Sequence, residues 1–260
     1  MNKHHLSAAV LSHHQIEDYF YSSISLMHQH ISEDVRAYAT GVEVHVLNFL
    51  LVTENHSQIA KNVQKGIRLL DEHFDIPFAV YAVKPNLQTL EVLRYAGFVP
   101  DVDGITTAMQ LDLLNWSVIN DVSAGYDIRC VEHDLRDWLI PVESAFETCN
   151  LLSAQYQKRH QAAIDAGKSL QHYALYVDGQ PVCALTLSRL GDIVRFDDIG
   201  TVTGMQRKGY ASALVNHVLA EAKQQGATAC YLDASPDGNG LYLRTGFLPL
   251  FEYQGFIRAE

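Results

Sequence analysis

The second half of the chain shows a succession of hydrophobic patterns, in which apolar residues recur at every second position or at every third and fourth. The first spacing is typical of half-buried strands and the second of amphipathic helices. In chain order the pattern predicts a strand at 127–131, helices at 134–149 and 153–167, three strands within 173–202, a helix ending at Gly226, a strand at 227–235, a short helix at 238–247 and closing strands at 248–258. This order predicts an α/β, or layered α+β, fold.

Proline and glycine mark several boundaries in this half. Pro141 interrupts the first predicted helix, and Gly167 is a typical C-cap for the second. Asp178-Gly179 and Gly191-Asp192 are typical of hairpin turns between the three strands. The clearest helical pattern is the one that ends at Gly226. Its apolar face comprises Ala211, Leu214, Val215, Val218, Leu219 and Ala222.

The two halves of the chain resemble each other. LRYAGFVP at 93–100 is similar to LRTGFLP at 243–249, at an offset of 149 positions (246 minus 97) that superposes their Gly-Phe pairs. The same offset aligns the helical pattern at 57–74 and the strand pattern at 77–83 with a helix and a strand of the second half. Two Gly-Phe turns can agree by chance, but the shared helix and strand favour an internal repeat.

The repeat predicts two copies of one fold. We place them at residues 1–115 and 126–260, with the join near 111–127. The aligned helix of the first copy has its own apolar stripe. This stripe comprises Ile59, Val63, Ile67 and Leu70.

Composition narrows the class of protein. Hydrophobic residues make up 48% and charged residues 19% of the 260 residues, which is typical of a folded chain. The formal net charge of -11 argues against general binding to nucleic acid or to an anionic membrane, because both need a basic surface. No apolar run approaches the roughly 20 residues of a membrane span. We therefore expect a soluble, cytoplasmic protein.

Neither cysteines nor histidines show the spacing of a metal site. The four cysteines form no Cys-x-x-Cys pair and are interpreted as reduced, apolar residues. The histidines of the first third lack a His-Glu-x-x-His spacing, so we interpret them as solvated or hydrogen-bonded side chains and predict no metal. These histidines are His4, His5, His13, His14, His28, His30, His45 and His56.

The stretch QRKGYASALV at 206–215 is the most informative for function. Its glycine, Gly209, stands just before a helical pattern and just after a strand-like run. The first turn of a helix exposes unpaired backbone N–H groups and the positive end of the helix dipole, and both stabilise a phosphate. Gly209 permits close approach of the backbone, and Arg207 and Lys208 add positive charge. The stretch therefore predicts a pyrophosphate-binding turn.

The segment IGTVTGMQRKGYASALV resembles the acetyl-CoA-binding segment of the GNAT superfamily of N-acetyltransferases, whose pattern is Gln/Arg-x-x-Gly-x-Gly/Ala after a splayed strand. Gln206, Gly209 and Ala211 fill the pattern, and Thr203 stands where a proline is common. LDASPDGNGLYLRTGF resembles the later part of the same fold, so that the likeness covers about residues 127–256. The resemblance implies two GNAT-like domains, each a mixed, mostly antiparallel sheet flanked by helices.

The resemblance also implies residue roles. The backbone of Ile199, Gly200 and Thr201 would pair with the pantetheine arm, as an added strand does. Ser235 stands where many members carry an asparagine that contacts the cofactor. The pyrophosphate would be held by the segment that begins at Gln206, through the backbone N–H groups of Arg207, Lys208, Gly209, Tyr210, Ala211 and Ser212.

Tyr242 aligns with the tyrosine proposed in many members as the acid that protonates the departing thiolate. A phenol with a pKa near 10 suits this role; the alternative is a tyrosine that only packs on its helix. The implied reaction is direct attack of a neutral amine on acetyl-CoA. Asp197, Asp198 and Glu143 are candidate bases, and the sequence does not choose among them.

The first copy lacks these features. Ala60 stands in place of Gly209, and Leu93 in place of Tyr242, although Asn86 aligns with Ser235. We therefore predict that the first copy does not bind acetyl-CoA and serves to cover the sheet, to shape the acceptor cleft or to mediate dimerisation.

The expected partners are acetyl-CoA and an amine acceptor, either a small-molecule primary amine or an amine on a protein or peptide. Nucleic acid and membranes are not expected partners, and a homodimer is left open. A non-catalytic acyl-CoA-binding or regulatory module is the main alternative. A Rossmann-type nucleotide enzyme is disfavoured, because no Gly-x-Gly-x-x-Gly follows a first strand.

Overall fold

The computed structural model describes residues 8–54, 56, 58–117 and 125–259. The helices of this part of the chain are α1 (Ala8–Ile24), α2 (Ile59–His73), α3 (Leu87–Tyr95), α4 (Arg136–Ala145), α5 (Asn150–Asp165), α6 (Tyr210–Gln224) and α7 (Pro236–Thr245). The strands are β1 (Met27–His30), β2 (Val35–Ala39), β3 (Asn48–Val52), β4 (Ala79–Val83), β5 (Phe98–Asp112), β6 (Asp127–Cys130), β7 (Leu170–Val177), β8 (Gln180–Leu190), β9 (Ile193–Thr201), β10 (Ala229–Ala234) and β11 (Leu248–Arg258).

The elements predicted for the second half are present, with shifted boundaries. Asp178 and Gly179 both have positive φ, 49° and 75°, as a tight hairpin turn between β7 and β8 requires. Pro141 lies inside α4 and does not end it, so the predicted interruption there is wrong. The helix that follows begins at Asn150, three residues earlier than predicted, and Gly167 follows its end with φ of 74°.

All described strands belong to one sheet, in the order β1-β2-β3-β4-β11-β5-β10-β9-β8-β7-β6. Neighbouring strands are antiparallel except for two pairs, β3 with β4 and β9 with β10. A mixed, mostly antiparallel sheet was predicted, and the structure confirms it.

The order of elements repeats between the halves. The series α1-β1-β2-β3-α2-β4-α3-β5 recurs as α5-β7-β8-β9-α6-β10-α7-β11, and the parallel pair occupies the same place in each series. Corresponding details lie 149 positions apart. Asn86 caps α3 by accepting a hydrogen bond from the Thr89 N–H, and Ser235 caps α7 by accepting one from the Gly238 N–H. The internal repeat predicted from the sequence is therefore a structural repeat.

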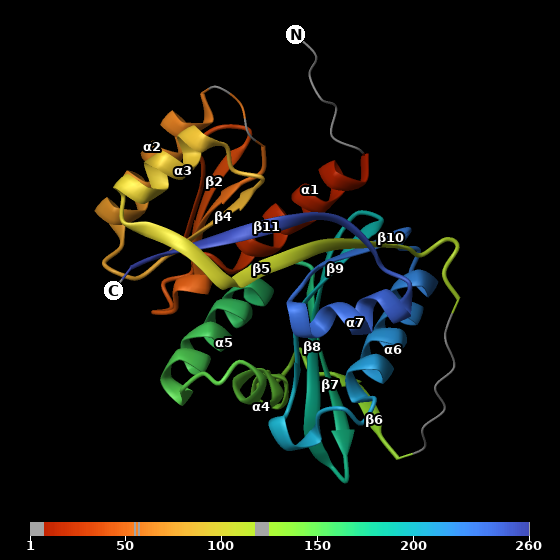
Figure 1. The fold of residues 1–260 in the computed structure, drawn as a ribbon. Helices are drawn as coiled ribbons and strands as arrows, with labels where there is room; N and C mark the ends of the chain where they lie inside the picture. The colour runs from red at the N-terminus through yellow and green to blue at the C-terminus, as the bar shows by residue number, and fades with distance from the viewer. Residues whose placement is uncertain (1–7, 55, 57, 118–124, 260) are drawn as a thin grey trace.

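The last strand of each series lies in the sheet of the other half. Strand β5 pairs with β10 along six residues, from Thr107 opposite Ala234 to Asp112 opposite Ala229. Strand β11 pairs with β4, and β11 and β5 pair with each other. Figure 1 shows β5 and β11 side by side as they cross from one half of the molecule to the other. The two halves thus share one continuous sheet.

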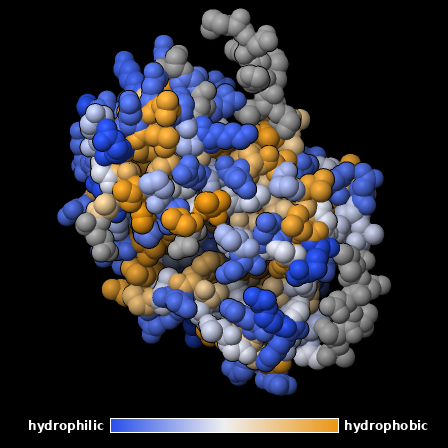
Figure 2. Space-filling model, viewed as in Figure 1, coloured by the Kyte–Doolittle hydropathy of each residue, from blue (hydrophilic) through white to orange (hydrophobic). Residues whose placement is uncertain are grey.

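Each half has its own apolar core on the sheet. One core gathers around α6 and the strands β7 to β10, and another around α2, α3 and the strands β2 to β4. The predicted stripe of α2 is buried in the second of these cores. Helix α1 packs instead across the junction, against α5 and strands β8 to β10. On the face drawn in Figure 2, hydrophobic side chains form separate patches among hydrophilic ones.

Candidate active site

Strands β9 and β10 separate partway along their length. Their parallel pairing covers only three positions, from Ile193 opposite Ala229 to Arg195 opposite Tyr231. Beyond Arg195, β9 continues to Thr201 paired with β8 alone, and β10 continues to Ala234 paired with β5. A wedge therefore opens between the two strands, and among the described residues no strand pairs with this edge of β9 beyond Arg195.

In the first half, the corresponding parallel strands stay paired to the end of β3. Strand β3 pairs with β4 along four positions, from Phe49 opposite Ala79 to Val52 opposite Ala82. By the 149-residue offset, Phe49 corresponds to Asp198, which has no partner on β10. Of the two parallel pairs in the described part of the chain, the one in the second half leaves space for an extended ligand arm.

A cavity of about 550 Å³ lies at this wedge. Residues from β9, β10 and α7 line it on one side, among them Asp198, Ile199 and Tyr242. Residues from the first half line the other side, including Phe49 of β3 and Tyr81 of β4. Volumes of several hundred cubic ångströms are typical of small-molecule sites.

The start of α6 follows the open end of β9. A short turn of 3-10 helix, Thr203–Met205, leads to Gln206, and Gly209 caps α6 with φ of 87°. Arg207 is also left-handed, with φ of 60°. The first hydrogen bond of the helix runs from the Ala213 N–H to the Gly209 carbonyl, so the N–H groups of Tyr210, Ala211 and Ser212 precede it.

The residues of this turn are open to solvent. Gln206, Arg207, Lys208 and Gly209 are exposed, while Tyr210, Ala211 and Ser212 are half-buried. The side chain of Gln206 turns back and donates to the Thr201 carbonyl at 3.4 Å. The chain itself therefore leaves the predicted pyrophosphate turn accessible.

The predicted pantetheine strand lies beside that turn. Ile199, Gly200 and Thr201 are the last residues of β9, just after a bulge at which Asp198 has φ of 54°. Helix α4 covers Gly200 closely, because a Cβ there would lie 2.9 Å from the Ala145 Cβ. A side chain at position 200 would push α4 away from the strand.

Tyr242 projects from α7 into the wall of the cavity. It is 7% exposed, its ring packs edge-on to Phe247, and a Cβ at Gly238 would lie 3.0 Å from the tyrosine ring. Burial raises the pKa of the Tyr242 phenol, so the phenol stays protonated at neutral pH. Ser235, which also lines the cavity, caps the same helix.

A buried ionic cluster lies where β9 and β10 part, and the sequence analysis missed its centre, Arg195. The Arg195 Nε donates to both carboxylate oxygens of Asp197 at 3.0 Å, and Nη2 donates to Asp233 at 2.7 Å. Burial raises the pKa of Asp197 to about 7 despite Arg195. Burial also acts to raise the pKa of Asp233, but Arg195 and His13 outweigh it and hold that pKa below its usual range.

Asp198 belongs to a second group of buried polar side chains. Its Oδ1 accepts a hydrogen bond from the Tyr156 hydroxyl at 2.9 Å, and its Oδ2, which has no hydrogen-bond partner among the described residues, lies 3.7 Å from His160 Nε2. Burial raises the pKa of Asp198 to about 6, although the nearby hydroxyls of Thr186 and Tyr156 act to lower it. His160 is in turn hydrogen-bonded to His172 at 2.8 Å. Glu143, the third candidate base, does not line the cavity.

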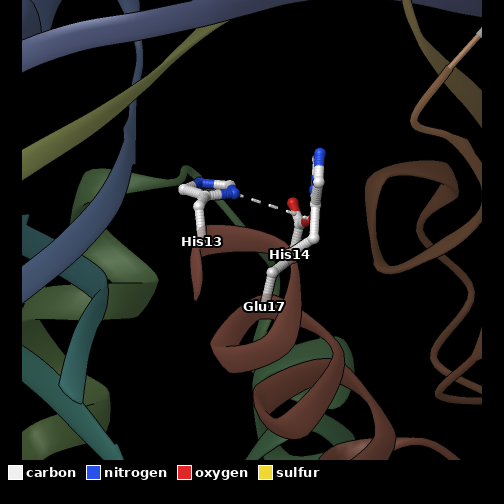
Figure 3. A group of neighbouring side chains, drawn as sticks. All are labelled: His13, His14 and Glu17. Carbon is white, nitrogen blue, oxygen red and sulfur yellow. Dashed lines mark hydrogen bonds and ion pairs between the residues drawn. The ribbon is translucent and has the colours of Figure 1, made fainter. Parts of the chain in front are cut away.

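Two of the histidines singled out in the sequence join Glu17 on α1. Figure 3 shows the Glu17 carboxylate turned toward the rings of His13 and His14. The ligand atoms of these three residues lie within 4.8 Å of one another, close enough to hold a metal ion. Glu17 already accepts a hydrogen bond from the Tyr253 hydroxyl at 2.9 Å, and His13 Nε2 is 3.0 Å from Asp233. We interpret the group as the support that fixes Asp233 and Tyr253 against α1.

Residues 133–247 match the model of the acetyltransferase (GNAT) family. Residues 133–247 therefore form a GNAT acetyltransferase domain. No curated protein matches the sequence.

Solved structures share the fold over most of the chain. A GCN5-related N-acetyltransferase from Kribbella flavida has a TM-score of 0.66 and 16% identity, covering 98% of this chain and 96% of its own. One from Sphaerobacter thermophilus has a TM-score of 0.63 and 15% identity, covering 86% of this chain and 76% of its own. A tandem GNAT protein from the clavulanic acid biosynthesis pathway has a TM-score of 0.60 and 13% identity, covering 86% and 77%. These likenesses extend the GNAT fold to the first half as well.

Among the described residues, none of the helices has the length and apolar character needed to cross a membrane.

Proposed function

We propose that the protein transfers an acetyl group from acetyl-CoA to a primary amine, by direct attack of the amine on the thioester in the second half of the chain. The observation that carries this proposal is the wedge between β9 and β10. It brings the edge of β9 and a buried tyrosine to one cavity, and the accessible start of α6 follows the end of the same strand. The proposal places the protein in the cytoplasm, where its four free cysteines stay reduced.

The residues present fit acetyl-CoA. Backbone N–H groups from Arg207 to Ser212 would hold the pyrophosphate, because the turn is accessible and α6 begins there. The free edge of β9 at Ile199, Gly200 and Thr201 would pair with the pantetheine arm, with Ser235 across the wedge. Acetyl-CoA supplies the acetyl group as a thioester.

The cavity supplies an acid and a base. The Tyr242 hydroxyl gives its proton to the sulfur as the C–S bond breaks, and the amine nitrogen, which forms the new C–N bond, loses a proton to a carboxylate. We assign the second role to Asp198, directly or through a water molecule. Both oxygens of Asp197 accept from Arg195, whereas Asp198 keeps one oxygen without a hydrogen bond.

This assignment predicts a rate that rises with pH. A carboxylate accepts a proton only when ionised, and with a pKa of about 6 the ionised share of Asp198 grows from about one tenth at pH 5 to about nine tenths at pH 7. We expect kcat/KM to follow this rise, and Asp198→Asn to lower it by about 10²-fold and to remove the inflection. The measurement is the pH profile of thiol release. Glu143→Gln, which alters a carboxylate outside the cavity, is the control; a profile unchanged in Asp198→Asn would refute the assignment.

We further propose that the first half, residues 1–115, binds no acetyl-CoA and shapes the acceptor side of the cavity in the second, residues 126–260. Its wedge is closed, and the start of α2 is filled by Ile59, which is fully buried where Lys208 is exposed. Titration calorimetry is expected to show one acetyl-CoA per chain. A stoichiometry of two, with the second equivalent surviving substitution of Gly209, would contradict this.

A non-catalytic acyl-CoA-binding module remains the alternative function, because the same wedge binds a cofactor without turnover. Thiol release from acetyl-CoA across a panel of primary amines, small and peptidyl, separates the two. Turnover with any amine supports the transferase; cofactor binding without turnover on the whole panel supports the module.

A further inference from the structure

We propose that the acceptor is a linear aliphatic diamine or polyamine, whose distal ammonium group is bound by the first half of the chain near Asp101. This inference rests on the proposed function, because it places the reacting amine beside Tyr242 and Asp198 in the same cavity.

The cavity is built by both halves. The second half contributes the reacting end, with Tyr242 and Asp198, and α1 contributes Glu17 to the lining. The opposite end is formed by strands of the first half and includes Tyr81 and Asp101. A ligand that fills this cavity must therefore contact residues of both halves of the chain.

Carboxylates outnumber cations in the lining of the cavity. Glu17, Asp101, Asp197, Asp198 and Asp233 line the cavity against a single basic residue of the described lining, Arg195. Arg195 is already bound to two of these carboxylates, Asp197 and Asp233. A lining of this sign attracts cations and repels carboxylates.

One of these carboxylates, Asp198, lines the reacting end of the cavity. The side chain of Asp198 is only 10% exposed, and its Oδ2 has no hydrogen bond within the described residues. The Oδ2 atom itself is buried beside His160, but the carboxylate lines the cavity, where a nearby ammonium group stabilises its ionised form.

The strand register separates the two acidic ends. Both positions can be compared along β11. Asp101 of β5 lies opposite Gly255 of β11. Asp233 of β10 lies opposite Ala108 of β5, which in turn lies opposite Phe251 of β11. The two positions are thus four residues apart on β11, which corresponds to about 13 Å along the strand. Both side chains line the cavity and take up part of this span, and an extended small polyamine has a comparable length.

The wall between the ends is apolar and aromatic. It includes Phe49 and Leu51 of β3, Tyr21 of α1 and Tyr253 of β11. Such a wall suits a methylene chain, and aromatic faces also favour a nearby ammonium group. The arrangement of acid, apolar wall and acid matches a chain of methylenes with a cation at each end.

Three amines of equal length, which differ only in the charge at the far end, test the proposal. We expect kcat/KM for 1,5-diaminopentane to exceed that for pentylamine by at least about ten-fold, and 5-aminopentanoate to be the poorest of the three. Spermidine extends the series toward the full length of the cavity and is expected to be at least as good as the diamine. Equal rates for the diamine and pentylamine, or a preference for 5-aminopentanoate, would overturn the proposal.

Asp101→Asn keeps the size of the side chain and removes its charge. We expect it to lower the ratio of kcat/KM for diamine over pentylamine by about ten-fold, while Asp127→Asn, on the exposed edge strand β6, leaves the ratio unchanged. Thermal unfolding of each variant is measured as a control, to check that the variant is folded. An unchanged ratio in Asp101→Asn would assign the distal ammonium elsewhere and refute the role of the first half.

Calorimetry separates this proposal from the proposed transferase activity. Diamine binding that is tighter than pentylamine binding and is weakened by Asp101→Asn, without turnover, would support the diamine site and refute the transferase. Turnover of amines with no preference for a second cation would support the transferase and refute the diamine site.

Discussion

Replacing Tyr242 with phenylalanine is expected to lower kcat by about 10² to 10⁴-fold and to leave the affinity for acetyl-CoA within a few-fold of the wild type. The substitution keeps the ring that packs against Phe247 and removes only the hydroxyl. Because burial raises the pKa of this phenol above its usual value of 10, the wild-type hydroxyl holds its proton across the neutral range. The proton is therefore available when the thiolate departs, and its loss affects the chemical step.

Steady-state thiol release and acetyl-CoA titration measure the two effects separately. Tyr173→Phe is the matched control, because Tyr173 is as buried as Tyr242 and belongs to the same core but does not line the cavity. A Tyr242→Phe variant with near wild-type kcat would remove the tyrosine from the mechanism. Weakened binding with unchanged kcat would give the hydroxyl a binding role instead.

Substituting alanine for Gly209 is expected to weaken acetyl-CoA binding by about 10 to 100-fold, as measured by calorimetry. Gly209 caps α6 with φ of 87°, a conformation that costs an L-residue about 1–2 kcal/mol. Its Cα also lies in the middle of the N–H groups proposed to hold the pyrophosphate, where a methyl group keeps the phosphates at a distance. Both effects reduce affinity, through a distorted turn and a blocked approach.

The other end of the same helix provides the control. Gly226 follows α6, also with φ of 87°, and a Cβ there meets nothing within 4 Å. Gly226→Ala therefore has the same backbone strain without contact to the site. We expect both variants to lose similar stability in denaturant unfolding and only Gly209→Ala to lose affinity. Equal affinity losses would mean that strain in α6, and not the turn itself, controls binding.

The local features of the active half could be predicted from the sequence. Periodicity located α6 and its apolar face, turn residues located the hairpin at Asp178, and glycine with flanking charge located the turn before α6. Each depends on neighbours in the chain. The same is true of the repeat, since Asn86 and Ser235 cap their helices through residues only three positions away.

The features that define the cavity depend on distant contacts and gave no local signal. His13 meets Asp233 across 220 positions of sequence, and Tyr253 meets Glu17 across 236. The hydrophobic pattern around Arg195 indicates a buried strand. It does not indicate Asp233, the distant carboxylate that helps to stabilise the buried charge of Arg195. The exchange of β5 and β11 was equally unpredictable, because the hydrophobic pattern of a strand does not specify the strand beside it.

The exchange of last strands bears on how the molecule is made. Strand β11 is synthesised after every other described element, yet it lies near the middle of the sheet, between β4 and β5. During translation, the emerging first half has an unsatisfied edge at β4 that only this late segment fills. Completion of the core around α2 and α3, which includes Phe256 of β11, therefore awaits the emergence of this strand from the ribosome, and the nascent chain needs protection from foreign strands until then.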